Sequence, residues 1–288
     1  MKNIKNLIVL MVISLATCNC GKDSPSDKNR PDEPDYSGLT PPIAIGHRGM
    51  YQTYPENTLS AIRACVENGM GIEFDVRTSK DGELVIMHDD NTARTTNGGS
   101  KRLRDLTLAE IKELDAGSWF GSAFAGERVP TLEEVLSTVK EKQKGTVLLA
   151  VNIKDVDAAG EVKLVNLLVK YNLLKQSFCF DQTEAASRRL KNLNASVKIG
   201  RNVGRGDLQK EIDEGLTDVF LIGFVLTSTE QELLRREHKD IVVNIGGANN
   251  GQNPALWRDH LLAGIDGIIV DYVAQFHDYI TNLFAPKS

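Results

Sequence analysis

From Ile43 onward, two kinds of hydrophobic pattern alternate along the chain. In the first, short runs rich in valine, isoleucine and phenylalanine are bounded by polar residues or glycine, which is typical of buried strands. In the second, apolar residues recur every three or four positions, as Val162, Val165, Leu168 and Val169 do. This spacing places them on one face of a helix. Repeated strand–helix units of this kind predict a parallel sheet covered by helices.

The first pattern predicts strands at Ile43–His47, Gly71–Arg77, Glu83–His88, Val147–Ile153, Ser177–Phe180, Val197–Arg201, Val219–Gly223, Ile241–Ile245 and Gly267–Val270. The second predicts helices at Asn57–Asn68, Leu132–Lys142, Ala158–Tyr171, Glu184–Leu193, Thr229–Glu237, Pro254–Ala263 and Gln275–Phe284. About eight strand–helix units within roughly 245 residues favour a closed TIM-type (β/α)8 barrel. A doubly wound open sheet is the alternative, but the first strand–helix turn, Gly46–Gly49, lacks the G-x-G-x-x-G fingerprint.

Residues 89–130 interrupt this alternation. They are rich in turn-forming residues at Asn97–Ser100, and helical spacing is found around Leu108–Leu114. A connection of this length inside a compact domain usually carries structure or function of its own. We therefore predict an insertion after the second strand, packed over the rim of the barrel.

The N-terminal residues have the pattern of an export signal. Lys2 and Lys5 precede an apolar run over residues 7–16, which is shorter than the roughly 20 residues that a membrane span needs. The stretch Leu15–Cys18 at the end of this run resembles a bacterial lipobox, in which the cysteine becomes the lipid-bearing N-terminus of the mature protein. An ordinary signal peptide cleaved nearby is the alternative interpretation.

These features predict the organisation and location of the mature protein. Residues 1–17 would be the lipoprotein signal peptide, Cys18 the lipid anchor, and residues 18–42, rich in proline and aspartate, a disordered tether. Residues 43–288 would form one barrel domain. We expect an exported protein of the bacterial cell envelope, facing the periplasm or the cell surface, and bound to a membrane only through its lipid.

Charge and composition exclude several classes of protein. The chain of 288 residues has a formal net charge of −5 and 6% aromatic residues, and loss of Lys2 and Lys5 with the signal peptide would make it more acidic. Such a chain is a poor nucleic-acid binder. Its 41% apolar content is too high for a disordered protein. Cys65 and Cys179 lie in apolar contexts and are expected to be buried free thiols, with a disulfide between them as the alternative.

Two acidic residues share one face of the second predicted strand. Alternation places Glu73 and Asp75 on the same side, while the apolar residues between them face the helices. Two adjacent carboxylates repel unless positive charge lies between them. Ca²⁺ or Mg²⁺ would satisfy both, because these hard cations prefer oxygen ligands. A strand end paired with Arg48 or Arg77 is the alternative.

Further polar residues follow neighbouring strands. The first strand ends in His47 and Arg48, and the third predicted strand ends in His88 and Asp89. In a parallel barrel, the carboxyl ends of the strands meet at one face, where active sites are built. Two histidines could act there as general base and general acid. Arg48 offers a planar donor group suited to phosphate oxygens. Together these groups favour phosphoester cleavage.

Several motifs, in order along the chain, resemble those of the glycerophosphodiester phosphodiesterase family. They are His47-Arg48-Gly49, Pro55-Glu56-Asn57-Thr58, Glu73-x-Asp75, His88-Asp89, Thr92-x-Arg94-Thr95-Thr96-Asn97-Gly98, Leu106–Glu110, Leu114–Phe120, Pro130–Val135 and Gly264–Tyr272. The resemblance is close over residues 43–155, thin over residues 156–262 and firm again at the last barrel unit. It implies a TIM-type barrel with the insertion at residues 89–130.

The resemblance also implies roles for single residues. His47 and His88 would be the acid/base pair, and Glu73, Asp75 and Asn152 would hold Ca²⁺ or Mg²⁺. Arg48 and Lys154 would bind the phosphate. Glu56 and Asn57 would contact these site residues without binding the substrate themselves. The implied reaction cleaves a glycerophosphodiester into an alcohol and glycerol phosphate, commonly through attack by the neighbouring glycerol hydroxyl.

This chain departs from the family pattern at three places. The family usually has a glutamate as third metal ligand where Val151–Lys154 here contains Asn152, whose carbonyl oxygen could still bind a hard cation. A tryptophan usual on a late strand is absent from Ile241–Ile245. The run after Ser177 continues to Asp181, which could restore the missing negative charge.

These departures leave two other functions open. One is a phospholipase C-like or inositol phosphodiesterase on the same barrel, and the other is a surface lipoprotein that binds phosphodiesters without cleaving them. In every case the expected partner is a small-molecule or lipid-headgroup phosphodiester. Metal-dependent turnover of a generic phosphodiester would separate the enzymes from the binding protein.

Overall fold

The structure is a computed structural model that describes residues 36, 38–246 and 252–285. The predicted signal peptide, the lipid anchor at Cys18 and most of the predicted tether lie outside these residues, so they stay predictions. Within the described ranges, no helix is both long enough and apolar enough to cross a bilayer.

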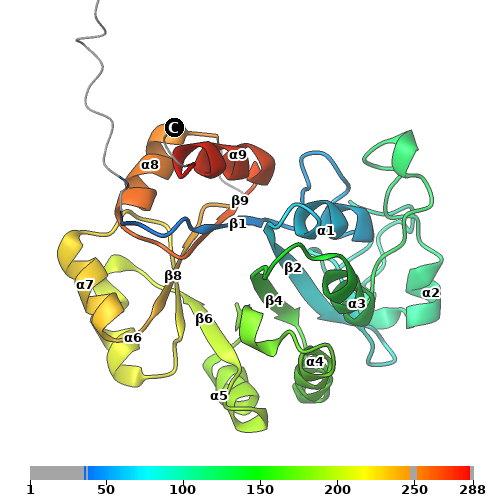
Figure 1. Cartoon of the computed structure of the whole chain (residues 1–288). Coiled ribbons are helices and arrows are strands. Elements are labelled where there is room, and N and C mark those ends of the chain that lie inside the picture. The colour runs from blue at the N-terminus through cyan, green and yellow to red at the C-terminus, as the bar shows by residue number, and fades with distance from the viewer. Residues whose placement is uncertain (1–35, 37, 247–251, 286–288) are drawn as a thin grey trace, which may run out of the picture. The chain divides into compact units, whose positions relative to one another are not determined.

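Eight parallel strands close into a barrel, which confirms the predicted TIM-type fold (Figure 1). These strands are β1 (Ile43–Gly46), β2 (Gly71–Thr78), β4 (Leu149–Asp155), β5 (Ser177–Phe180), β6 (Lys198–Asn202), β7 (Val219–Ile222), β8 (Asp240–Asn244) and β9 (Gly267–Val270). Each pairs with its neighbours in this order, and β9 and β2 both pair with β1, which closes the ring.

Helices surround the ring of strands (Figure 1). They are α1 (Leu59–Val66), α2 (Leu108–Lys112), α3 (Leu132–Lys142), α4 (Ala158–Lys170), α5 (Glu184–Leu193), α6 (Leu208–Glu214), α7 (Ser228–Arg236), α8 (Pro254–Leu262) and α9 (Val273–Leu283). Threonine side chains cap α1, α2, α3, α5 and α7 by accepting a hydrogen bond from the first helical turn. The sequence pattern missed α6, a short helix with two apolar residues, Leu208 and Ile212, which ends at the left-handed Gly215.

The third predicted strand does not belong to the barrel. β3 (Leu84–Ile86) pairs antiparallel with the far end of β2. The turn between them is too short for a parallel crossover, which needs a dozen or more residues. In this turn the backbone amide of Ser79 donates to the carbonyl of Glu83, and Gly82 has a φ of 78°. The chain therefore folds back, and β3 returns His88 to the level of Asp75.

The barrel has two apolar layers, one between the strands and the helices and one in the barrel interior. Ile72, Phe74 and Val76 of β2 pack outward against helices, as predicted. The interior layer is formed by Ile45, Ala150, Phe178, Phe180, Val219, Leu221, Val242 and Ile269. Because strand residues two apart share a face, the next inward positions on three of these strands are His47, Asn244 and Asp271. A polar layer thus lies directly above the apolar interior.

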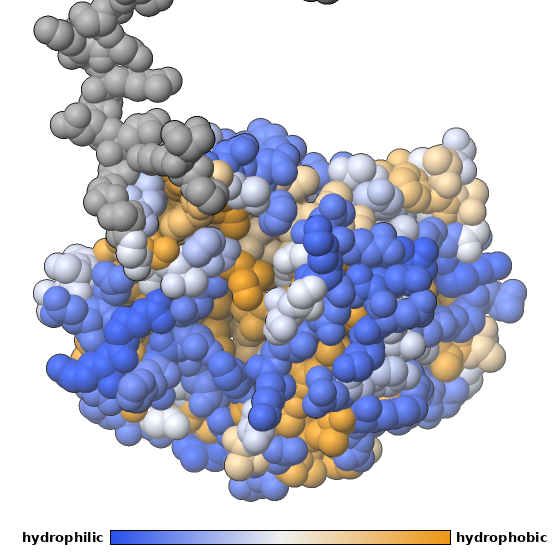
Figure 2. All heavy atoms as spheres, in the orientation of Figure 1, coloured by the Kyte–Doolittle hydropathy of each residue, from blue (hydrophilic) through white to orange (hydrophobic). Residues whose placement is uncertain are grey.

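Residues 89–130 have structure of their own. They contain the 3-10 turns η1 (Leu103–Asp105) and η2 (Ser122–Phe124) on either side of α2. A separate apolar cluster joins this segment to β3. Asp115 accepts hydrogen bonds from the backbone amides of Gly117, Ser118 and Gly126, which fixes the tip. Apolar side chains gather at this tip, at the upper right of the molecule in Figure 2.

The cysteines follow the sequence interpretation. Within the described part of the chain, Cys65 and Cys179 are free thiols, and both are buried. Burial raises the pKa of both thiols, to about 12 for Cys179. These thiols therefore pack as small apolar groups and are inert at neutral pH.

Candidate active site

A cavity of about 150 Å³ opens in the polar layer of the barrel. Of the residues singled out from the sequence, it brings together His47, Glu73, Asn152, Lys154 and Asp181. His88 does not line this cavity. It lies in a small neighbouring depression lined also by Glu56 and Asn57. The predicted site residues therefore divide into two groups. Asp75 and Arg48 connect them, because Asp75 lies near both Lys154 and Arg48, and Arg48 donates to Glu56.

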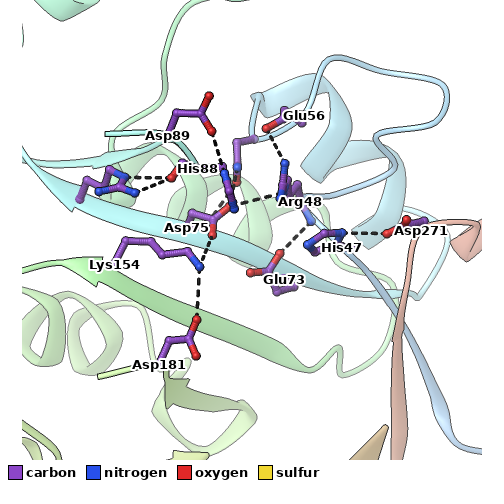
Figure 3. Close-up of polar contacts among 12 residues, drawn as sticks. His47, Arg48, Glu56, Glu73, Asp75, His88, Asp89, Lys154, Asp181 and Asp271 are labelled. Carbon is purple, nitrogen blue, oxygen red and sulfur yellow. Dashed lines mark hydrogen bonds and ion pairs between the residues drawn. The ribbon is translucent and has the colours of Figure 1, made fainter. Parts of the chain in front are cut away.

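His47 follows β1 and is held by a residue from the other end of the chain. Its Nδ1 lies 2.8 Å from Oδ1 of Asp271, which follows β9 (Figure 3). Because an ionised carboxylate only accepts hydrogen bonds, Nδ1 carries the proton and proton exchange falls to Nε2. Burial lowers the pKa of His47, but the hydrogen bond to Asp271 and the charge of Glu73 outweigh burial and raise the pKa above its usual value. A methyl group on Gly246 would lie 2.8 Å from Cγ of His47, so this side of the ring is tightly packed.

His88 has an equivalent acidic partner beside it. Its Nδ1 lies 2.8 Å from Oδ1 of Asp89. Hydrogen bonds from Arg94 are the main cause that holds the pKa of Asp89 well below its ordinary range, so this carboxylate is ionised. Arg77 donates from Nε and Nη2 to the backbone carbonyl of His88, at 3.0 and 2.6 Å. Both histidines thus have Nδ1 beside a carboxylate oxygen, and Nε2 is the nitrogen that remains for proton exchange.

The two carboxylates of β2 are buried side by side. Glu73 and Asp75 are each 1% exposed. Burial and, next, the charge of Asp75 raise the pKa of Glu73. The backbone amide of Arg48 donates to Oε2 of Glu73 at 2.9 Å, and Asn57 donates through Nδ2 to Oδ2 of Asp75 at 2.8 Å. Arg48 and Asn57 both have positive φ, of 56° and 57°, so the loop after β1 is bent specifically to reach these carboxylates.

Three buried oxygen atoms fit a hard cation. Oε1 of Glu73, Oδ1 of Asp75 and Oδ1 of Asn152 have no hydrogen-bond partner among the described residues. Asp75 and Asn152 are direct neighbours across β2 and β4. Buried polar atoms are normally satisfied, and carboxylate and amide oxygens are ligands of Ca²⁺ and Mg²⁺. In the part of the chain that the structure covers, no three His, Cys, Asp or Glu side chains form a metal-binding group, and the third oxygen here belongs to an amide.

An ionic network ties the insertion to the barrel. Glu56 accepts two hydrogen bonds from Arg94, both at 2.7 Å, and one from Nη1 of Arg48 at 3.0 Å. Arg94 also donates to Asp89 at 2.7 and 2.9 Å. Nε of Arg48 lies 3.8 Å from Asp75. The network therefore runs from the partner of His88 to the carboxylates of β2, and Glu56 lies at its centre.

We expect Glu56→Gln to lower the free energy of unfolding by about 3 kcal/mol at pH 7, because it leaves two guanidinium groups without their buried carboxylate. Burial raises the pKa of Glu56, but the hydrogen bonds from Arg94 and the charge of Arg48 outweigh burial and lower it. Its ionised form therefore stabilises the fold above the ordinary carboxyl pKa of about 4.5, and this contribution is lost as the pH falls through the lowered folded-state pKa.

Urea unfolding at several pH values measures this effect. The difference between wild type and Glu56→Gln should shrink as the pH falls below about 4.5. Glu184→Gln is the matched control, because Glu184 pairs with Arg188 on the surface of α5 and should contribute less than about 1 kcal/mol. A difference for Glu56→Gln as small as that of the control would show that the network does not stabilise the fold.

Lys154 lies between two acids from different strands. Its Nζ is 3.6 Å from Oδ1 of Asp75 and 3.2 Å from Oδ2 of Asp181 (Figure 3). Asp181 also accepts a hydrogen bond from Asn202 at 3.1 Å. The Lys154 side chain is 21% exposed and lines the cavity, so it can meet an anion there.

Sequence reasoning assigned no role to three residues that the structure places in the site. Asp271 continues the inward face of β9 two positions beyond Ile269, and this spacing could have revealed it. Asp89 directly follows His88, and Arg94 lies five residues further on in the same motif. Their charges were visible in the sequence, but their partners were not.

Comparison with known proteins identifies relatives of this chain. A relative from Caldanaerobacter subterraneus subsp. tengcongensis named glycerophosphodiester phosphodiesterase is 40% identical over 162 residues, which cover 55% of this chain and 65% of the relative. YhdW of Bacillus subtilis, which carries a provisional assignment to the same activity, is 33% identical over 240 residues, covering 79% of this chain and 93% of YhdW. This chain thus spans just under two thirds of the first relative's length.

A solved structure shares the fold and about a quarter of the aligned residues. A phosphodiesterase from Oleispira antarctica, solved in complex with the product sn-glycerol-3-phosphate, superposes with a TM-score of 0.67 at 26% identity, covering 85% of this chain and 98% of the other. The sequence profile of the glycerophosphoryl diester phosphodiesterase family matches residues 47–275, from His47 to the start of α9. The chain belongs to the glycerophosphoryl diester phosphodiesterase family, whose members are phosphoric diester hydrolases.

Proposed function

We propose that this protein hydrolyses glycerophosphodiesters to an alcohol and glycerol phosphate, with a divalent cation and with His47 and His88 as the acid/base pair. The observation that carries the proposal is the shared geometry of the two histidines. Each has Nδ1 at 2.8 Å from an aspartate oxygen, so Nε2 is the ring nitrogen that remains for proton exchange.

The reaction needs two proton transfers. One histidine removes a proton from the attacking oxygen, which belongs to the neighbouring glycerol hydroxyl or to water. The phosphorus–oxygen bond to the alcohol breaks, and the other histidine donates the proton that this oxygen gains. Where the glycerol hydroxyl attacks, water then opens the cyclic phosphate. Carboxylate partners at both Nδ1 atoms fix the tautomers and support positive charge on either ring.

In this proposal, Arg48 and Lys154 would bind the phosphate. The guanidinium of Arg48 lies between Glu56, which accepts from Nη1 at 3.0 Å, and Asp75, which is 3.8 Å from Nε. Its planar donor group suits phosphate oxygens. The ammonium of Lys154 faces the cavity. Glu73, Asp75 and Asn152 would hold Ca²⁺ or Mg²⁺, which when bound would stabilise negative charge on the phosphate oxygens.

The comparisons support the substrate class. Family members carry the name glycerophosphodiester phosphodiesterase, and the Oleispira antarctica structure contains sn-glycerol-3-phosphate. The volume of the cavity, about 150 Å³, suits a small polar group rather than a long acyl chain. We therefore propose that the substrate is a deacylated phosphodiester, and that its glycerol phosphate part enters the cavity.

Product analysis tests this proposal. The full-length protein should release choline and glycerol phosphate from glycerophosphocholine in the presence of Mg²⁺ or Ca²⁺. A chelator should abolish the reaction, and added cation should restore it. Release of glycerol and phosphocholine instead would contradict the proposed bond cleavage. Binding of the diester without turnover under any of these cations would show that the protein is a binding protein.

A further inference from the structure

We propose that Asp181 is a positioning residue that supplies the negative charge missing at Asn152, and that it does so by holding the ammonium of Lys154 away from the cation-binding oxygen of Asp75. The inference rests on the proposed cation dependence. It assigns Asp181 no contact with the cation and no part in proton transfer. Its role is to set the charge and the availability of the oxygen atoms that bind the cation.

The sheet register places Asp181 beside the site. Asn152 of β4 is the direct neighbour of Phe180 in β5, so Asp181 is the first residue beyond the pair. Asn152 and Asp181 line the same cavity. A carboxylate lost from β4 can therefore be replaced in charge by one that follows the adjacent strand.

The backbone at Asp181 is bent to bring its side chain there. Asp181 has a φ of 67°, in the left-handed region that residues other than glycine rarely adopt. Its carboxylate is held on both oxygens, with Nζ of Lys154 at 3.2 Å from Oδ2 and Nδ2 of Asn202 at 3.1 Å from Oδ1. Such a conformation persists where the surroundings determine it, and here the surroundings are two side chains of the polar layer.

Lys154 explains why this carboxylate matters. Its ammonium lies between Oδ2 of Asp181 and Oδ1 of Asp75, and it is nearer to Asp181 by 3.2 Å against 3.6 Å. Oδ1 of Asp75 is one of the three buried oxygens without a hydrogen-bond partner in the described chain. Without the charge of Asp181, the ammonium would be attracted to Asp75 alone and would compete with a cation for that oxygen.

The buried oxygens point to a ligand independently of Asp181. Glu73, Asp75 and Asn152 are at most 6% exposed, and each has an oxygen without a hydrogen bond from any described residue. Two of them carry charge. Glu73 and Asp181 line the cavity, and Asp75 lies 3.6 Å from the ammonium of Lys154, so three carboxylates surround this ammonium group and the unpaired oxygens. The charge that the sequence lacks at position 152 is therefore present one strand away.

Calorimetric titration with Mg²⁺ and with Ca²⁺ tests this inference without using activity. Asp181→Asn should raise the dissociation constant of the cation about tenfold, because it removes one elementary charge from a partly exposed site. Asparagine is the suitable replacement because it tolerates positive φ and its oxygen can still accept from Asn202.

Asp240→Asn is the matched control. Asp240 pairs with Lys198 and has 42% side-chain exposure against 37% for Asp181. It begins β8, at the opposite end of the barrel from the cavity. The control removes the same charge and a similar ion pair. Because Asp240 is far from the cavity, the cation affinity of this variant should equal that of wild type. Thermal unfolding should show the same small loss of stability in both variants.

A second substitution separates charge from local structure. Asn152→Asp in the Asp181→Asn background returns a carboxylate to the cavity and should restore most of the lost affinity. Equal dissociation constants for wild type, Asp181→Asn and Asp240→Asn would overturn the inference while leaving the proposed function intact. Failure of the wild type to bind either cation would overturn the proposed cation dependence, and this inference with it.

Discussion

Replacing either His47 or His88 with asparagine is expected to lower kcat for glycerophosphodiester hydrolysis by about 10³-fold, because each variant loses a group that moves a proton in the rate-determining chemistry. KM should change far less, since the cation site and the phosphate-binding groups remain. Asparagine keeps a polar group near the partner carboxylate in each case. This choice limits the structural cost of leaving Asp271 or Asp89 without its imidazole.

His277→Asn provides the control. His277 lies on α9, its side chain is 32% exposed against 34% for His88, and its Nδ1 is 3.9 Å from an oxygen of Asp278. This variant should keep wild-type kcat. Normal kcat in either the His47 or the His88 variant would show that this histidine does not take part in proton transfer.

A second substrate can assign the two roles. A glycerophosphodiester of 4-nitrophenol releases a leaving group that needs no proton. The variant that lacks the general acid should recover most of its activity on this substrate, whereas the variant that lacks the general base should not. Equal recovery by both variants would contradict a division into one acid and one base.

The arrangement of β2 could be predicted from the sequence because it depends on a local rule. Alternation along the strand placed Glu73 and Asp75 together, and it placed the apolar residues between them against the helices, as the structure confirms. The bounds of α3 and α5 were predicted to the residue, since their capping threonines and apolar spacing lie within the helices or directly before them. Such features depend on residues that are close in the sequence, so they can be predicted without knowing which distant segments pack against them.

The direction of β3 could not be predicted from such local patterns. Its apolar run predicts a strand but contains no information on whether the strand runs parallel or antiparallel to β2. The prediction that His88 ends a parallel barrel strand was therefore wrong, although its position near Asp75 is retained. The hairpin brings His88 back because β2 extends beyond the barrel and β3 returns along it.

Partners that are distant in sequence could not be predicted. His47 and Asp271 are separated by 224 positions, and their hydrogen bond follows from the closure of the barrel between β1 and β9. Arg94 and Glu56 are 38 positions apart and meet because the insertion folds over the rim. In both cases the sequence contains the charges, and the fold alone determines the pairs.

We expect Asp271→Asn to lower kcat about 10²-fold, second only to the loss of a histidine. Asp271 fixes the proton of His47 on Nδ1, and an amide in its place can stabilise the wrong tautomer. Asp271 also raises the pKa of His47, against the lowering effect of burial. The variant should therefore have a His47 of lower pKa as well as a disordered ring orientation.

The pH profile of kcat/KM distinguishes this role from a purely structural one. If His47 is the general base, its pKa sets the acidic limb, and if it is the general acid, its pKa sets the alkaline limb. In either case Asp271→Asn should move that limb to lower pH and leave the limb of His88 in place. Tyr51→Phe is the control, because it removes one hydrogen bond to Asp271 but keeps the carboxylate, and it should keep both limbs. Unshifted limbs in Asp271→Asn, with kcat reduced, would mean that Asp271 supports the fold at this point rather than the proton transfer.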